Sequence, residues 1–313
     1  VINSSWGGTP AESWTSREML ETLPFLSNRL VQSDAAVKNY TPDAAQRDYE
    51  TQLAAWSNSV REARAKGARE PRPPQLWNPY ASPWQPASLF NAMIAPVIPF
   101  GMRGVLWYQG EANAGNAAGY RELFPAMIRD WRARWRQGDF PFLFVQLANF
   151  MAVQTEPSQT SATWPFLREA QTMTLREPKT GMACAIDLAD PDNPDDIHPK
   201  NKQDVARRLA LAARHVAFGE QLVHSGPLYR SATITNAQVT ITFDHTGGGL
   251  AARGGKLQGF AIAGDDGQFV WADARIKDAA VVVSATNVPA PVAVRYNWAN
   301  NPIGNLYNAE GLP

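Results

Sequence analysis

The sequence predicts an α/β fold in which helices cover a parallel sheet, followed by a C-terminal unit made of β-strands. Two observations predict the first part. Apolar runs without polar alternation recur, as in strands buried on both faces, and amphipathic helical patterns lie between them. From about residue 225 the pattern changes to short β-like runs between Gly, Asn and Asp turns. We therefore expect a core over residues 1–224 and a β-sandwich-like domain over residues 225–313.

Four apolar runs are the candidate strands of the core, and each ends in polar or glycine-rich residues. They are "VINSSWGGTP" (1–10), "GMRGVLWYQGEAN" (101–113), "FPFLFVQLANF" (140–150) and "GMACAIDLADPD" (181–192). The carboxyl ends of parallel strands lie at one edge of a sheet, and ligands bind in the crevice beyond that edge. We therefore expect the functional residues where these runs end.

Helical patterns separate these runs. Residues 117–138 place apolar side chains three and four positions apart, with arginines on the other side, and end at Gly138. Residues 201–219 repeat this design and end at Gly219. A third pattern, over about residues 35–75, is mostly polar, starts near a Thr-Pro pair and ends at a glycine and several prolines. We interpret it as a helical insertion in the core.

The composition excludes several classes of partner. The chain has 29 basic and 29 acidic side chains in 313 residues, so no net field attracts nucleic acid or an anionic membrane surface. No apolar stretch is long enough to span a bilayer. The single Cys184 lies in an apolar run and can form no intrachain disulfide. The chain opens within a strand-like run and without an initiator Met, so we expect it to be the downstream part of a longer protein.

The strongest candidate for chemistry is "PDDIHPKN", residues 194–201, a turn-prone run that follows a predicted strand. His198 can act as a general base if a carboxylate fixes its tautomer and stabilises the imidazolium. Asp195 stands three residues earlier, a spacing that lets both side chains point the same way on a short loop. Asp192 and Asp196 are expected to be solvated or capping carboxylates. The alternative is that His198 only caps the helix that follows.

The second candidate is "WYQGEAN". Trp107 ends a predicted buried strand, so Gln109 and Asn113 should emerge at its carboxyl end. Amide side chains at that place can donate hydrogen bonds to a developing oxyanion. The alternative is that they only satisfy the backbone of the loop. Glu111 is interpreted either as a substrate-binding group or as a buried structural carboxylate.

The third candidate is the Gly-Gly turn in "SSWGGT". Glycine has no side chain to keep a ligand away from the backbone, so the N–H of Gly7 or Gly8 can also face an oxyanion. Ser4 and Ser5 precede this turn, but neither stands in a G-x-S-x-G elbow. We therefore do not expect either of them to be a nucleophile.

The segments "SSWGGTPAESW", "WYQGEAN", "FPFLFVQLANF" and "DIHPKNKQDVARRLAL" together resemble the sialate O-acetylesterase family of the SGNH hydrolase superfamily, whose members include bacterial acetylxylan-type esterases. The resemblance runs along the whole chain. It implies a three-layer α/β core of the SGNH hydrolase type with a parallel sheet, plus an attached β domain. It also implies a serine carboxylic-ester hydrolase that uses neither metal nor cofactor. Such an enzyme removes O-acetyl groups from sugars such as sialic acid or the side chains of plant hemicellulose.

The resemblance assigns roles to the candidate residues. It implies that His198 is the base and Asp195 its orienting carboxylate. It implies an oxyanion hole formed by Gly8, or Gly7, together with Gln109. Asn113 is a further candidate for that hole, because superfamily relatives usually present an asparagine where this family presents the glutamine.

A sugar substrate would also give tryptophans a role, because indole faces stack on pyranose rings. We expect the substrate cleft to be lined by Trp6 and Trp107, with Trp14 and Trp84 as further candidates. Glu111 is expected to contact the substrate there.

The nucleophilic serine of the family belongs to a G-Q-S-N type motif upstream of the first strand, and no such motif occurs in this sequence. We expect the serine on a preceding segment, which can be a separate N-terminal fragment of the same polypeptide. The resemblance also implies export, to the periplasm or outside the cell. Two alternatives stay open. One is a non-catalytic carbohydrate-binding or scaffolding protein that keeps this fold; the other is a metal hydrolase using the aspartates around His198, although no second histidine stands near them.

Overall fold

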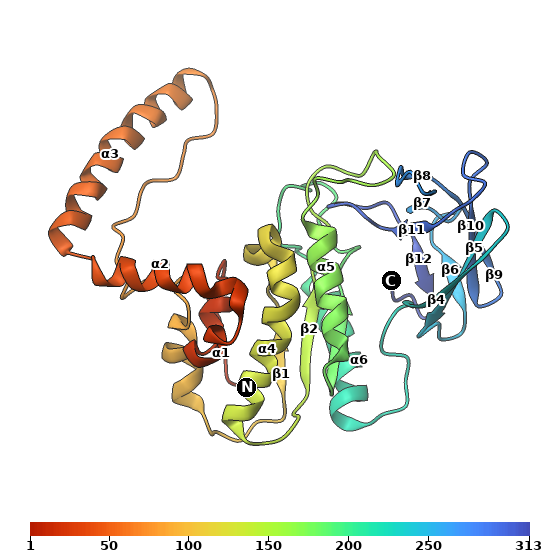
Figure 1. Ribbon diagram of the computed structural model, residues 1–313, viewed down its shortest axis with the longest axis horizontal. Helices are drawn as coiled ribbons and strands as arrows, with labels where there is room; N and C mark the ends of the chain where they lie inside the picture. Colours follow the sequence, from red (N-terminus) through yellow and green to blue (C-terminus); the bar gives the residue numbers. More distant parts are fainter. The chain divides into compact units, whose positions relative to one another are not determined.

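The computed structural model describes residues 1–313, which form two compact units. The first unit comprises Val1–Ile98 and the second Pro99–Pro313, and each is described by itself (Figure 1). None of the helices combines the length and the apolar character that crossing a membrane requires.

The first unit is helical. Helix α3 begins where the sequence predicts, because the Thr41 hydroxyl accepts a hydrogen bond from the backbone N–H of Ala44 (3.3 Å) and Pro42 occupies the first turn. The predicted insertion over residues 35–75 therefore contains one long helix, although its first residues belong to the preceding helix. The elements of this unit are η1 (Ala11–Trp14), α1 (Arg17–Glu21), η2 (Pro24–Leu26), α2 (Ser27–Lys38), α3 (Pro42–Ala65), η3 (Phe90–Ile94) and η4 (Ala95–Val97).

The predicted strand at the start of the chain is absent. Residues 1–6 adopt no regular secondary structure, and the side chains of Val1 and Ile2 are exposed. A strand needs a partner for its backbone N–H and C=O groups, and these residues pair with none of the strands of the structure. The apolar pattern of these residues predicted a strand, but the pattern does not show whether another strand lies beside them.

Three parallel strands form the sheet of the second unit, in the order β1-β2-β3. They are β1 (Val105–Trp107), β2 (Phe142–Gln146) and β3 (Thr180–Cys184). Each of these strands falls within a run that the sequence predicts, as do two of the helices. The helical elements of this part are η5 (Glu111–Asn116), α4 (Ala117–Trp135), α5 (Trp164–Met173), η6 (Thr174–Arg176) and α6 (Lys202–Phe218).

Side chains of the central strand β2 alternate between two helical layers. Phe144 points toward α4, where the ring of Phe124 packs against it at a centroid distance of 5.1 Å. Leu143 points to the other face: a Cβ built on Gly181 of β3 would lie 3.0 Å from Leu143 and 3.2 Å from Ala212 of α6. Because α4 and α6 cover opposite faces of the sheet, this core has the three layers that the resemblance implies.

Helix α6 has a defined signal at each end, and its terminal glycine lies where the sequence predicts. At its start, the Asn201 side chain accepts a hydrogen bond from the backbone N–H of Asp204 (3.1 Å) and donates one to its carboxylate (2.8 Å). At its end, Gly219 adopts a left-handed conformation with φ of 73°. The loop that carries His198 therefore joins a well-defined helix start to the end of strand β3.

The rest of the second unit is antiparallel β structure, as predicted. A four-stranded sheet has the order β4-β5-β10-β9, a three-stranded sheet has the order β11-β7-β8, and β12 pairs with β6. Phe260 and Ile262 of the three-stranded sheet share one apolar cluster with Val281 and Val283 of the four-stranded sheet, as in a sandwich. The strands are β4 (Leu228–Thr235), β5 (Gln238–Asp244), β6 (Leu250–Ala252), β7 (Phe260–Ala263), β8 (Val270–Trp271), β9 (Asp273–Lys277), β10 (Ala280–Ser284), β11 (Ala293–Tyr296) and β12 (Leu306–Asn308). The domain boundary at residue 225 stays a prediction, because the compact second unit contains both parts.

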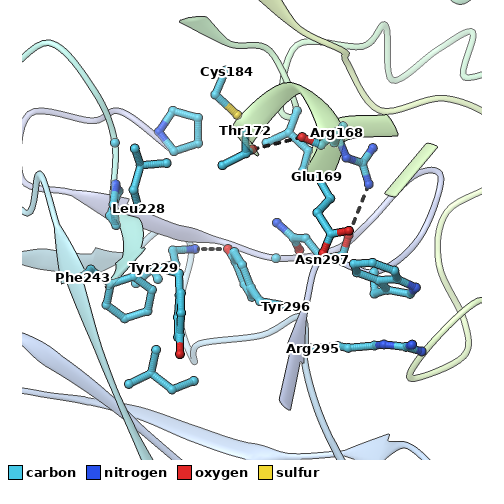
Figure 2. Close-up of a pocket in the computed structure, with 18 of the residues that line it drawn as sticks. Arg168, Glu169, Thr172, Cys184, Leu228, Tyr229, Phe243, Arg295, Tyr296 and Asn297 are labelled. Carbon is cyan, nitrogen blue, oxygen red and sulfur yellow. Dashed lines mark hydrogen bonds between the residues drawn. The ribbon is translucent and has the colours of Figure 1, made fainter. Parts of the chain in front are cut away.

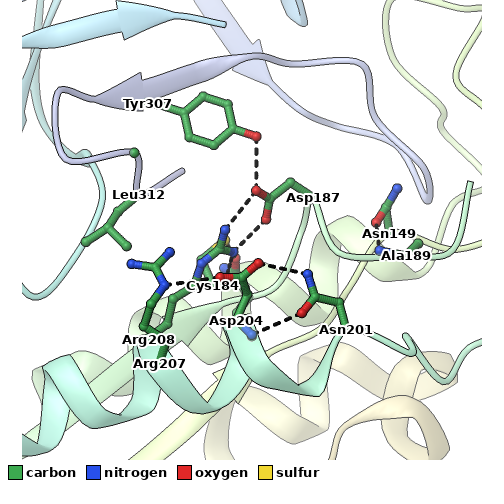
Figure 3. Close-up of polar contacts among 12 residues, drawn as sticks. Asn149, Cys184, Asp187, Ala189, Asn201, Asp204, Arg207, Arg208, Tyr307 and Leu312 are labelled. Carbon is green, nitrogen blue, oxygen red and sulfur yellow. Dashed lines mark hydrogen bonds and ion pairs between the residues drawn. The ribbon is translucent and has the colours of Figure 1, made fainter.

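Polar contacts join the α/β part of the second unit to its β part. Figure 3 shows Asp187, which follows β3 and accepts hydrogen bonds from Arg208 of α6 (2.6 and 2.9 Å) and from the hydroxyl of Tyr307 of β12 (3.1 Å). One carboxylate thus ties a helix to a strand of the β part.

Arg168 of α5 makes a second connection. Only 4% of this residue is exposed, and its guanidinium donates hydrogen bonds to the backbone carbonyls of Asn297, Ala299 and Asn300. Burial lowers the pKa of Arg168 to about 10. The charge is therefore held by carbonyl dipoles at a site where water cannot replace them.

Replacing Arg168 by methionine should lower the free energy of unfolding of this unit by about 3 kcal/mol, because three carbonyls would lose a charged donor. Chemical unfolding followed by tryptophan fluorescence measures this loss. The matched control is Arg121→Met, which breaks an exposed ion pair with Glu169 (2.6 Å) and should cost less than about 1 kcal/mol. Similar small losses for both variants would contradict the structural role of Arg168.

Three of the four histidines gather where α6 meets the β part. The rings of His215 and His224 are stacked, with centroids 3.8 Å apart, and His245 lies edge-on to His224 at 4.9 Å. Burial lowers the pKa of His224, and the charges that His215 and His245 can carry lower it further. The folded protein therefore favours the neutral form of His224.

This cluster predicts a loss of stability in acid. The pKa of His224 lies below its ordinary value in the folded protein only, so protons bind the unfolded chain first as the pH falls. The contribution of His224 is fully present above its ordinary pKa of about 6.5 and is lost as the pH falls below that value. Thermal unfolding of the wild type and of His224→Gln between about pH 7.5 and 5.5 measures the effect. The variant should lose less Tm than the wild type; an equal loss would refute the prediction.

Candidate active site

His198 lies in the loop between β3 and α6, and 77% of its side chain is exposed. Its Nδ1 is 3.1 Å from Oδ1 of Asp196, and the same carboxylate oxygen accepts a hydrogen bond from the backbone N–H of His198 (2.9 Å). This backbone hydrogen bond is the main cause that holds the pKa of Asp196 below its usual range. The other ring nitrogen, Nε2, faces away from this contact.

The carboxylate that contacts the ring is thus Asp196, which the sequence analysis interpreted as solvated or capping. Asp196 does cap the backbone, and an aspartate two residues before a histidine brings its carboxylate to the ring through the same turn. Asp195 is exposed and makes no hydrogen bond or ion pair in the structure. The predicted contact between Asp195 and His198 is therefore not formed here, and the catalytic role of Asp195 stays a prediction.

The Q-G-E loop follows β1 directly. The Gln109 side chain donates a hydrogen bond to Oδ1 of Asn113 (2.7 Å) and accepts one from the hydroxyl of Tyr120 (3.1 Å). The structure therefore brings the two amide candidates for an oxyanion hole together.

Gln171 of α5 fixes this loop and was missed by sequence reasoning. Its side chain, 1% exposed, donates to the carbonyls of Gln109 (3.1 Å) and Val145 (3.2 Å). A Cβ on Gly110 would lie 3.0 Å from the Gln171 side-chain nitrogen and 2.9 Å from Leu167, so only glycine fits there. A glutamine on a helix face gives no sequence signal for this role.

Glu111 connects the Q-G-E loop with the His198 loop. Burial raises the pKa of Glu111, whereas the positive charges of His198 and Lys202 oppose this rise. Lys202, the first residue of α6, also places its ammonium 5.2 Å from the ring centroid of Tyr108. The loops that follow β1 and β3 therefore come together beyond the carboxyl edge of the sheet, where the sequence predicted the functional residues.

Known proteins resemble this chain in sequence and in fold. Residues 77–215 match the family described as carbohydrate esterase, sialic acid-specific acetylesterase. The chain is 33% identical over 262 residues to the sialate O-acetylesterase of Rattus norvegicus, and 39% identical over 244 residues to that of Homo sapiens. A solved structure of a novel carbohydrate acetylesterase from Xanthomonas citri is 39% identical, with a TM-score of 0.73 over 99% of this chain.

The chain belongs to the sialate O-acetylesterase family. The alignment to the rat protein covers 78% of this chain and 44% of the rat protein, and the alignment to the human protein covers 73% of this chain and 38% of the human protein. The alignment to the solved structure covers 58% of that structure's chain. The chain thus spans less than half the length of the curated relatives. The residues that match the family description include both the Q-G-E loop and His198, whereas Gly7 and Gly8 lie outside that match.

The Gly-Gly turn lies in the first unit. Gly8 has a φ of 74°, and its carbonyl accepts a hydrogen bond from the indole N–H of Trp84 (2.9 Å). Trp6, beside the turn, is 52% exposed. The roles of Gly7, Gly8 and Trp6 in an oxyanion hole and a substrate cleft stay predictions.

Trp107 does not fit the substrate-binding role that the sequence analysis gave it. Only 8% of this residue is exposed, and its ring packs against Phe124, Trp131 and Phe142 at centroid distances of 6.3, 5.9 and 6.4 Å. The side chain of the last residue of β1 points into the aromatic core below α4. Trp107 therefore positions the strand that precedes the family's Q-G-E loop.

The second unit also contains a cavity of about 750 Å³ between α5, β3 and the β part (Figure 2). Its lining includes Cys184, whose thiol donates to the side-chain oxygen of Gln146 (3.1 Å). Burial raises the pKa of this thiol to about 11, so it is not a nucleophile at neutral pH. None of the family's expected catalytic residues lines this cavity, and we place the active site at the two loops instead.

The structure contains no group of three or more His, Cys, Asp or Glu side chains placed to hold a metal ion. The aspartates around His198 are thus not gathered as the metal-hydrolase alternative requires.

Proposed function

We propose that this family member acts as a carbohydrate O-acetylesterase and releases acetate by a Ser-His-Asp mechanism. The observation that carries the proposal is the meeting of two loops, where the ammonium of Lys202, which begins the helix after the His198 loop, lies 5.2 Å from the ring centroid of Tyr108 beside the Q-G-E loop. The family match covers both loops, and two amide side chains stand beside them. This arrangement supplies a base and hydrogen-bond donors for an oxyanion within one site.

The proposed chemistry begins when Nε2 of His198 takes the proton of a serine hydroxyl, whose oxygen attacks the acetyl carbonyl carbon. A carboxylate of the same loop holds Nδ1–H of His198. Gln109 donates to the oxyanion, together with the N–H of Gly8 or Gly7 and that of the serine. The bond to the sugar oxygen breaks, and His198 returns the proton to that oxygen. Water then attacks the acetyl-serine by the same steps and releases acetate.

The serine itself is proposed to lie on a segment outside residues 1–313, because the expected G-Q-S-N motif does not occur in this sequence. That segment can belong to the same polypeptide or to a separate fragment of it. The proposed substrates are acetylated sialic acid or acetylated side chains of hemicellulose such as xylan, and the proposed location is the periplasm or the outside of the cell. Glu111, whose pKa burial raises, is proposed to hydrogen-bond a sugar hydroxyl.

The native polypeptide that contains these residues tests the proposal. It should release acetate from acetylated xylan or from O-acetylated sialic acid, and a fluorophosphonate probe should add covalently to one serine, as intact mass and peptide mapping would show. A His198→Ala variant should block the probe reaction. If the polypeptide released no acetate and formed no adduct with the probe but still bound glycans, its function would be that of a non-catalytic carbohydrate-binding protein.

A further inference from the structure

Exposed aromatic side chains gather in the segment that follows α3. Trp77, Tyr80 and Trp84 are 46, 72 and 49% exposed, and Leu76 beside them is 52% exposed. Aromatic side chains normally bury most of their surface, and single exposed ones need no explanation. Several within so short a segment form a patch of the kind that marks a binding surface.

The rings are fixed relative to one another. Tyr40, between α2 and α3, packs edge-on against Trp77 at a centroid distance of 5.7 Å and against Tyr80 at 5.8 Å. Edge-to-face packing holds each ring in one orientation while one of its faces stays accessible. We name Tyr40, Trp77 and Tyr80 the aromatic platform.

The segment that carries the aromatic platform is also anchored to the rest of its unit. On one side, the indole N–H of Trp56 in α3 donates to the carbonyl of Pro71 (2.9 Å). On the other side, the Ser33 hydroxyl donates to the side-chain oxygen of Gln85 (2.5 Å). The platform is therefore ordered before any ligand arrives, which lowers the entropic cost of binding.

The segment that carries Trp77 and Tyr80 contains no charged side chain. Residues 73–102 contain no Asp, Glu, Lys, Arg or His, whereas Gln75, Asn78 and Ser82 supply amide and hydroxyl groups. Nucleic acid, an acidic peptide or an anionic membrane would find no cation in this segment. A neutral pyranose fits, because its C–H faces are apolar and its rim carries hydroxyls that amides and hydroxyls can bind.

A hydrogen bond connects this segment to the Gly-Gly turn. Trp84 Nε1 donates to the carbonyl of Gly8 (2.9 Å), within the same unit. Under the proposed function, this turn faces the acetyl group of the substrate. We propose that the aromatic platform binds neutral pyranose residues that adjoin the acetylated sugar of a glycan chain. This inference rests on the proposed function for its place in catalysis, but not for the binding itself.

Binding is tested with the native polypeptide and two neutral probes, xylohexaose and cellohexaose, by isothermal titration calorimetry. The Trp77→Ala/Tyr80→Ala double variant should lose at least about tenfold in affinity for one of them, because stacking on two rings is lost. Tyr80→Phe keeps the ring and should bind within about twofold of the wild type. The matched control is Tyr229→Ala, which removes a 68% exposed tyrosine on β4 and should change nothing.

Kinetics give the second readout. The double variant should raise KM for acetylated xylo-oligosaccharides about tenfold while leaving the hydrolysis of p-nitrophenyl acetate, which has no sugar, unchanged. Unchanged hexasaccharide binding by the double variant, or an equal loss in Tyr229→Ala, would overturn the inference. Self-association of the wild type in sedimentation velocity that is lost in the Trp77→Ala/Tyr80→Ala variant would also overturn the inference, because the patch would then be a protein interface. Absent hydrolysis of p-nitrophenyl acetate would contradict the proposed function alone.

Discussion

Replacing His198 by alanine in the native polypeptide should lower kcat/KM for acetate release by about four orders of magnitude. The serine hydroxyl loses its base, and the sugar oxygen loses its proton donor. Because 77% of the His198 side chain is exposed, the substitution removes no core packing and should leave the unfolding transition unchanged. Acetate release from an acetylated sugar and from p-nitrophenyl acetate measures the loss.

The matched control is His245→Ala, which removes a histidine of the β part. It should keep kcat/KM within about threefold of the wild type, because nothing in the proposed mechanism uses this side chain. If His198→Ala retained more than about a tenth of the activity, the base would have to be another residue and the proposed mechanism would fail.

The largest remaining effect is expected for Asp195→Asn, with a loss of about three orders of magnitude in kcat. Asp195 has no partner in the structure, so its carboxylate is available to the His198 ring when that ring turns toward a serine. The contact of the ring with Asp196 is exposed and therefore weak, so it does not prevent this turn.

Asp196→Asn is the matched variant, one residue away. An asparagine keeps the oxygen that accepts the His198 backbone N–H, so the turn should persist and kcat should fall less than about tenfold. The ratio of the two losses decides which carboxylate orients the base. A large loss in Asp196→Asn with a small one in Asp195→Asn would reverse the assignment and give the role to the contact seen in the structure.

Local signals in the sequence were sufficient for most of the fold. The Thr-Pro start of α3 and the glycine that ends α6, Gly219, are short-range features, and both lie where they were expected. Helix α5 was not predicted, although its residues fill the space beside β2. The strand expected over residues 1–6 failed for a different reason, because an extended run becomes a strand only when another strand satisfies its backbone.

The candidate site could be predicted less completely than the fold. Strand ends indicated the two loops, since the carboxyl edge of a parallel sheet is a property of the topology. The sequence could not predict the direction in which these side chains point. Trp107 turns into the aromatic core, and Asp196 rather than Asp195 reaches the His198 ring. Gln171 acts on the loop from a different helix, and such long-range support leaves no pattern in neighbouring residues.

Helix α3 buries only Ala45 and Val60 among its 24 residues. Its amide hydrogens are therefore protected almost entirely by the helix itself, and they should exchange with deuterium through local fraying, long before the amides of the buried sheet. Apart from Trp56 and Arg64, whose side chains bind the segment that follows the helix, little depends on its side chains. Away from these two residues, this helix is also the place where a reporter domain or a protease recognition sequence can be inserted while the rest of the chain keeps its structure.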